Sequence, residues 1–155
     1  MMNTILKTVN KLLVSVLLVA AVLLPSAAFA GETISVFKSP TCGCCEKWVE
    51  HLKQNGFAVD VHNVQDTSVY REKLGMPMKY GSCHTASING YTIEGHVPAR
   101  EIKRLLKEKP KATGLAVPAM VAGSPGMEGP RSDPYQVLLV KTDGNASVYQ
   151  NYNGK

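Results

Sequence analysis

Three of the four cysteines in this 155-residue chain, Cys42, Cys44 and Cys45, fall within four positions of one another. They follow a run typical of a strand, residues 33–37, and lead into a run whose apolar residues have helical spacing. The thiols are therefore expected on a turn between a strand and a helix. Free N–H groups and the positive dipole end at a helix start favour the thiolate, which is the form that attacks disulfides and binds metals.

The cysteine spacing leaves two chemistries open. Cys42 and Cys45 have the Cys-x-x-Cys spacing of dithiol redox proteins, in which one thiol attacks and the other resolves the mixed disulfide. Such an exchange gains nothing obvious from Cys44. Three thiols on one turn, together with Cys83, suit a soft metal site better, because thiolates select Cu(I), zinc or iron–sulfur clusters. Purely structural disulfides are less favoured, because the loops they would close on this turn are tiny.

The methionines favour copper among these metals. Met76, Met78, Met120 and Met127 all fall in loops rich in Pro and Gly, and none lies on a clear helix face. Methionine is most often core filler, but four in loops of so small a domain are candidate thioether ligands, Met127 first and Met120 second. Zinc makes little use of thioethers, whereas Cu(I) accepts them.

Two of the four histidines are candidate ligands. His84 directly follows Cys83, and His96 ends a predicted strand, so both could reach the cysteine turn. Imidazole binds Cu(I) and Cu(II), and the alternative for each is a hydrogen-bonded structural histidine. His51 and His62 are expected to be solvated, on a helix and a strand respectively.

The first thirty residues are typical of a cleaved secretory signal peptide. Two lysines precede an apolar run at residues 12–24, and Ala-Phe-Ala at 28–30 forms a cleavage site. The run is shorter than the ~20 residues that span a bilayer, so no membrane span is expected after cleavage. Residues 31–155 are long enough for one domain, exported to an oxidising compartment.

The charge balance of residues 31–155 argues against a nucleic-acid partner. Fifteen basic and twelve acidic residues give a net charge of +3, and the basic residues are scattered rather than clustered. Few aromatic residues lie among them. The basic residues, Lys38 included, are interpreted as a solvated surface.

The patterning beyond the turn predicts an α/β domain with the order β-α-β-α-β-β-α. The strands are expected at residues 33–37, 58–64, 82–88 and 91–94, and the helices at 44–55, 69–74 and about 97–109. Residues 111–155 would extend this domain as a Gly- and Pro-rich loop and a β-hairpin of strands 135–140 and 146–152. The order is that of the thioredoxin and glutaredoxin fold, in which the segment entering the third strand lies beside the redox turn. Cys83 is therefore expected to face the other three cysteines.

Several motifs, spread over about residues 33–152, resemble those of the CopG-type periplasmic copper-resistance proteins. They are Cys42-Gly43-Cys44-Cys45, Ser82-Cys83-His84-Thr85-Ala86, Glu94-Gly95-His96-Val97-Pro98-Ala99, Gly114-Leu115-Ala116-Val117-Pro118 and Gly123-Ser124-Pro125-Gly126-Met127-Glu128. The resemblance implies a thioredoxin-like periplasmic domain that binds several copper ions bridged by cysteine sulfurs and interconverts Cu(I) and Cu(II). Its metal site would use the four cysteines, followed by Met127 and His96. Residues 117–122, Val-Pro-Ala-Met-Val-Ala, depart from the family's Val-Pro-Gly-Met-Pro form around Met120.

The favoured hypothesis is a periplasmic protein of copper resistance that holds more than one Cu(I) per chain. Its partners would be copper ions and other periplasmic copper-handling proteins. One alternative is a periplasmic thiol–disulfide oxidoreductase that uses Cys42 and Cys45. Another is a copper chaperone that hands a single ion to an exporter or an oxidase.

Overall fold

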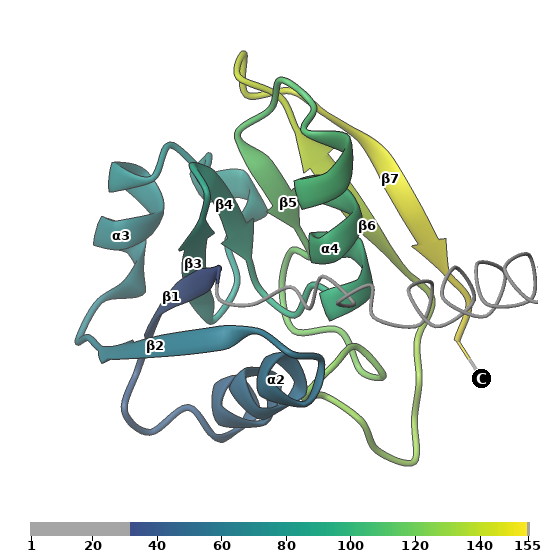
Figure 1. Cartoon of the computed structure of the whole chain (residues 1–155). Helices are drawn as coiled ribbons and strands as arrows, with labels where there is room; N and C mark the ends of the chain where they lie inside the picture. Colours follow the sequence, from purple (N-terminus) through teal and green to yellow (C-terminus); the bar gives the residue numbers. More distant parts are fainter. Residues whose placement is uncertain (1–31, 155) are drawn as a thin grey trace, which may run out of the picture. The chain divides into compact units, whose positions relative to one another are not determined.

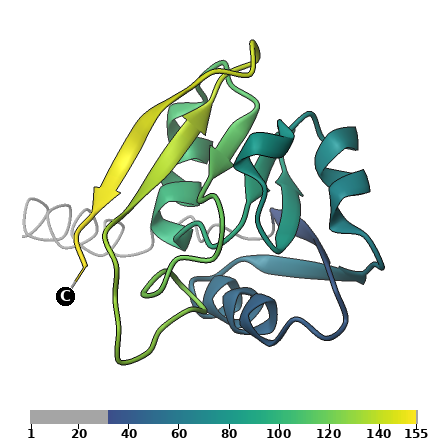
Figure 2. The same cartoon turned by 180° about the vertical axis from the view of Figure 1, so that it is seen from behind.

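The computed structural model describes residues 32–154, so the predicted signal peptide lies outside the described part of the chain. These residues form a seven-stranded mixed sheet flanked by helices (Figures 1 and 2). Across this range, no helix combines the length and the apolar character that crossing a bilayer requires.

The elements follow the predicted order, and the thioredoxin-like fold class is confirmed. They are β1 (Thr33–Lys38), α2 (Gly43–Gln54), β2 (Ala58–Asn63), α3 (Thr67–Lys73), the 3₁₀ helix η1 (Met78–Tyr80), β3 (His84–Ile88), β4 (Tyr91–Glu94), α4 (Ala99–Glu108), β5 (Gly114–Ala116), β6 (Tyr135–Val140) and β7 (Ala146–Tyr152). The strands lie side by side in the order β2-β1-β3-β4-β5-β6-β7.

The pairing of β1 with β3 brings the two cysteine-bearing segments to one end of the sheet. β1 pairs antiparallel with β3, and its last residue, Lys38, lies opposite His84, the first residue of β3. The cysteine turn follows Lys38, and Cys83 directly precedes His84. Strand register therefore places residues about forty positions apart in the sequence next to each other.

The start of α2 is capped by sulfur. Cys42 is the N-cap residue, with extended backbone, and its Sγ accepts a hydrogen bond from the backbone N–H of Cys45 at 3.3 Å. One N–H group that the first helical turn leaves without a backbone partner is thereby satisfied. Gly56 follows the other end of the helix with φ 86°, a left-handed conformation that glycine adopts without strain.

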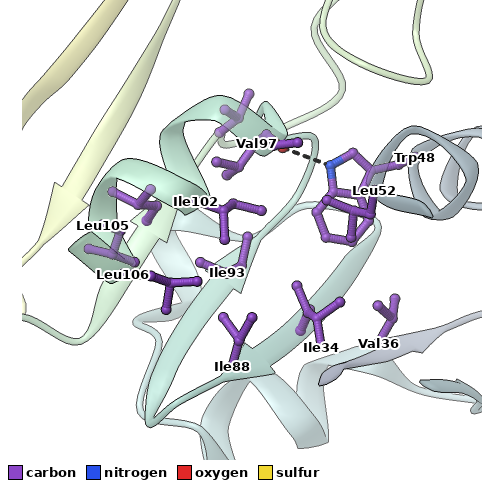
Figure 3. Close-up of a cluster of buried hydrophobic side chains, with 14 of the residues drawn as sticks. Ile34, Val36, Trp48, Leu52, Ile88, Ile93, Val97, Ile102, Leu105 and Leu106 are labelled. Carbon is purple, nitrogen blue, oxygen red and sulfur yellow. Dashed lines mark hydrogen bonds between the residues drawn. The ribbon is translucent and has the colours of Figure 1, made fainter. Parts of the chain in front are cut away.

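The main core lies between the sheet and the helices α2 and α4, whose side chains converge on the same strands (Figure 3). Its fully buried members include Ile34 and Ile93 from the strands, Trp48 and Leu52 from α2, and Ile102 and Leu105 from α4. Trp48 also donates from its indole Nε1 to the carbonyl of Val97 at 2.9 Å, which joins α2 to the segment before α4. Burial of this apolar surface fixes the start of α2 against the sheet.

A buried ion pair on the opposite face of the sheet holds the segment before Cys83. Arg71 of α3 contacts the Glu94 carboxylate through Nε at 2.9 Å, and both side chains are almost fully buried. The same carboxylate oxygen accepts the backbone N–H of Ser82 at 2.7 Å, and Arg71 donates to the Ser82 carbonyl at 2.7 Å. Thr85 donates its hydroxyl to the other Glu94 oxygen at 2.6 Å. Residue 82 is thus fixed by both of its backbone polar groups.

The structure adds one strand that was not predicted. Residues 114–116, expected within a loop, form β5, which pairs parallel with β4 and antiparallel with β6. A side chain at Gly114 would collide with the backbone of Thr92, so this close approach requires glycine. Through β5 the terminal hairpin joins the sheet.

Replacing Arg71 by methionine should leave the Glu94 carboxylate buried without its cation. We expect Arg71→Met to destabilise the metal-free protein by about 3–5 kcal/mol at neutral pH. Burial raises the pKa of Glu94, and the donors from Arg71, Thr85 and Ser82 oppose that rise. A carboxyl group with a raised folded-state pKa destabilises the fold only while it is ionised, so the loss should shrink as the pH falls into the acid range.

Urea unfolding at neutral and at mildly acidic pH measures this difference. The control is Arg71→Met/Glu94→Gln, in which no charge is buried, and its loss should be smaller and should not shrink as the pH falls. A loss in Arg71→Met that is the same at both pH values would contradict the expectation.

Candidate functional site

The Sγ atoms of all four cysteines lie within 4.8 Å of one another. The Cys45 and Cys83 sulfurs are 3.4 Å apart, and those of Cys42 and Cys44 are 3.5 Å apart. The structure thus brings Cys83 against the turn before α2, as the fold-based expectation required. Four sulfurs at these distances can bind a soft metal ion.

The cluster is partly oxidised in this structure. Cys42 and Cys45 form a disulfide, whereas Cys44 and Cys83 keep free thiols. This pairing uses the Cys-x-x-Cys spacing, one of the pairings that the sequence left open. All four sulfurs become available as thiolates only after this disulfide is reduced.

His96 presents an unprotonated nitrogen to Cys83. Its Nδ1 lies 2.8 Å from the Pro125 carbonyl oxygen, so Nδ1 must carry the proton. Burial lowers the pKa of His96 and keeps the ring neutral, which leaves a lone pair on Nε2. Nε2 lies 3.1 Å from the Cys83 sulfur. A backbone carbonyl that fixes the tautomer in this way is the usual support of a metal-binding histidine.

His84 also lies beside this sulfur and is fully buried. Its Nδ1 is 3.4 Å from the Cys83 Sγ, and its ring packs on the indole of Trp48, with 4.3 Å between ring centroids. Burial lowers the pKa of His84 to about 3, so the ring is neutral. Its Nε2 has no hydrogen-bond partner within residues 32–154. The ligand atoms of Cys83, His84 and His96 form a second group within 4.8 Å.

The environment of Cys83 favours the protonated thiol over the thiolate. Burial, together with the nearby Cys44, raises the pKa of Cys83 to about 12. A metal ion at the cluster would offset this effect by its own positive charge.

The loop at residues 123–127 forms one wall of the site. Gly126 adopts a left-handed φ of 85°, and a side chain there would collide with the Cys44 carbonyl and the Trp48 backbone. The loop thereby lies directly on the first turn of α2, between β5 and β6 in sequence (Figure 2). Because Pro125 also holds His96, this wall connects the imidazole to the cysteine turn.

The four candidate methionines separate by exposure. Met76 is 2% exposed and packs in a small core with Ala116 and Val140, so it is core filler. Met78 and Met120 are 57% and 53% exposed. Met127 is half-buried and adjoins Gly126. Of the four methionines, Met127 alone lies in the loop at residues 123–127 that forms one wall of the site.

The loop that carries Met120 is held against the segment before Cys83. Ala119 has φ 63°, a left-handed conformation that glycine adopts more readily than alanine. Its N–H donates to the Gly81 carbonyl at 3.1 Å, and its carbonyl accepts a hydrogen bond from the Ser82 hydroxyl. These contacts hold Ala119 in the left-handed conformation.

Two expectations about surface residues are wrong. His51 is half-buried, and its Nε2 accepts the backbone N–H of Ala99 at 3.0 Å, capping the start of α4, where Pro98 offers no side-chain acceptor. Lys38 is buried, and its Nζ lies 3.0 Å from a Glu46 carboxylate oxygen beside the first turn of α2. Helical periodicity and local charge patterns do not show contacts between distant elements. His62 is on the surface, as expected.

Two family models match adjacent parts of the chain. The glutaredoxin family matches residues 34–79, which include the three clustered cysteines, and a family described as "Protein of unknown function, DUF411" matches residues 80–127. The second segment holds Cys83, both site histidines and Met127. The candidate site thus lies across the boundary between the two matches.

Two solved structures are similar to the chain over most of its length. They are described as "Copper resistance protein copG", Form 1 and Form 2, with 47% and 46% sequence identity and a TM-score of 0.75 for each. Each match covers 79% of this chain and 98% of the solved chain. No curated protein matches the chain. At this identity and coverage, the chain belongs to the CopG family of copper resistance proteins.

Proposed function

We propose that this chain is a periplasmic copper-binding protein of copper resistance that holds Cu(I) on the thiolates of Cys42, Cys44, Cys45 and Cys83. The observation that carries the proposal is the meeting of four sulfurs, from two distant segments, within 4.8 Å. The copper resistance proteins to which the chain is similar support the choice of metal. Thiolate ligands select Cu(I), and a sulfur can bridge two ions, so more than one ion per chain is expected.

Neighbouring donors extend this ligand set. The Nε2 of His96 faces Cys83 with its lone pair, and the Nδ1 of His84 lies 3.4 Å from the same sulfur. Imidazole binds both Cu(I) and Cu(II), whereas thiolate and thioether favour Cu(I). A site with both donor classes suits interconversion between the two oxidation states. Met127 and, at the exposed rim, Met120 complete the proposed set.

The periplasmic location is part of the proposal. Residues 1–30 would act as a cleaved signal peptide, and residues 31–155 would function as the exported domain. A disulfide between Cys42 and Cys45 is compatible with an oxidising compartment. Copper ions and other copper-handling proteins of that compartment would be the partners.

Copper titration of the reduced, metal-free protein tests the main proposal. We expect uptake of more than one Cu(I) per chain, measured anaerobically against a chromogenic Cu(I) chelator. Cys42→Ser/Cys44→Ser/Cys45→Ser should lose this uptake, and Cys83→Ser should reduce the number of ions bound, because the removed sulfurs include those expected to bridge them. Unchanged uptake in the triple variant would refute the proposal.

Two methionines provide a matched pair for the rim of the site. Met127→Leu keeps the apolar volume but removes a thioether beside the wall that contacts Cys44, and it should weaken Cu(I) binding roughly tenfold or more, as loss of a supporting group does. Met120→Leu removes a thioether that is 53% exposed and should have a smaller effect. Chelator competition measures both affinities. Equal effects of the two substitutions would contradict the proposal that Met127 contributes more to Cu(I) binding than Met120 does.

The Cys42–Cys45 disulfide at the start of a helix favours a second candidate function, periplasmic thiol–disulfide exchange with partner proteins. Insulin reduction by the metal-free chain tests it. If this function holds, the wild type is active and Cys42→Ala loses all activity, because Cys42 is the thiol at the helix start. An inactive wild type, or a fully active Cys42→Ala, would exclude it.

A further inference from the structure

The disulfide of this structure has a free thiol next to it. The Sγ of Cys83 lies 3.4 Å from the Sγ of Cys45, one of the two bonded sulfurs. Reacting atoms about 3–3.5 Å apart are within reach of a near-attack arrangement. Thiol–disulfide exchange proceeds by attack of one sulfur on another, so the two sulfurs are placed for reaction.

We infer that the metal-free chain undergoes an intramolecular disulfide exchange, in which Cys83 attacks Cys45 and releases Cys42. The bond between the Cys42 and Cys45 sulfurs breaks, and a bond between the Cys45 and Cys83 sulfurs forms. The Cys83 proton passes to Nε2 of His96, and the bonding electron pair of the old disulfide stays on the Cys42 sulfur as a thiolate. One disulfide is lost and one is gained, so no external oxidant or reductant is consumed.

The leaving sulfur is already held by the helix start. Cys42 is the N-cap residue of α2, and its Sγ accepts the Cys45 N–H at 3.3 Å. The backbone donor and the positive end of the helix dipole stabilise a thiolate at this position. A thiol that is a better thiolate also leaves faster from a disulfide. The position of Cys42 at the helix start therefore favours its release as a thiolate.

His96 is placed to receive the proton. Its Nε2 lies 3.1 Å from the Cys83 sulfur, and its Nδ1 is fixed by the Pro125 carbonyl at 2.8 Å. A nucleophile, a base and a group that orients the base form the usual arrangement for activating a thiol. A base is needed because the thiolate, not the thiol, is the attacking form of a cysteine.

The exchange changes which thiols the chain presents. Before it, the free thiols are Cys44 and Cys83, on different segments. Afterwards they are Cys42 and Cys44, whose sulfurs lie 3.5 Å apart in this structure, both half-exposed at the start of α2. An oxidised chain would then still offer two neighbouring thiols on one turn to a soft monovalent cation or to a partner disulfide.

Peptide mapping of the metal-free, oxidised chain tests the inference. Trypsin releases residues 39–47, with the three clustered cysteines, separately from residues 80–100, with Cys83. Only a disulfide to Cys83 links these two peptides. The measurement uses Cys44→Ser, in which Cys42, Cys45 and Cys83 remain, after acid quench and alkylation of the free thiols. A second sample is alkylated in the native state over time.

We expect linked peptides that carry the alkyl label on Cys42. In the natively alkylated sample these peptides should accumulate at least tenfold more slowly when His96→Gln is added, because a positioned base contributes a factor of this order or more. Cys42→Ser/Cys44→Ser is the reference for the product, because it leaves only Cys45 and Cys83. With oxidised glutathione, its one intramolecular disulfide should link the two peptides.

Opposite results are equally clear. Label on Cys83 only, with the disulfide confined to residues 39–47 in both samples, would overturn the exchange. Linked peptides that form at an unchanged rate in the His96→Gln background would overturn the role of His96. Because no copper is present, these results are independent of the copper titration, and either proposal can fail without the other.

Discussion

The site depends on how the backbone at residue 82 is held. The Glu94 carboxylate accepts the Ser82 N–H, and Arg71 donates to the Ser82 carbonyl. Both contacts are on the face of the sheet that does not carry the main core. Buried charges require near-complete pairing, so this arrangement permits little movement. Cys83 comes next in the chain and must face the turn before α2. An ion pair that touches no sulfur thus fixes the distance between the two halves of the sulfur cluster.

Three segments with different chemistry meet at the sulfur cluster. The start of α2 supplies three sulfurs and a helix dipole, and the segment entering β3 supplies the fourth sulfur and His84. The loop at residues 123–127 supplies a carbonyl that orients His96. The two imidazoles are neutral, and the Cys83 thiol resists ionisation. Without a cation the cluster therefore carries little charge, so burying it costs little desolvation energy. This holds until the sulfurs bind a metal or form a new disulfide.

Much of this arrangement could be predicted from the sequence. Strand and helix periodicity predicted the element order. The match of that order to the thioredoxin fold predicted that Cys83 faces the cysteine turn. The Arg71–Glu94 pair, the burial of Lys38 and the cap that His51 provides could not be predicted, because each joins elements far apart in sequence. β5 was missed because its three residues, Gly114–Ala116, are too few to show an alternation of apolar and polar residues. The methionines were separable only by exposure, which loop sequences do not reveal.

Ala119 links the sulfur cluster to the molecular surface. A residue with a Cβ in the left-handed region is strained by roughly 1 kcal/mol relative to glycine, so neighbours must hold it there. They do so through Gly81 and Ser82, the two residues before Cys83. A shift of Cys83 toward a new bonding partner would pull on both hydrogen bonds and let the loop relax. The exposed thioether of Met120, next to Ala119, would then shift at the protein surface when the Cys83 sulfur changes its bonding partner.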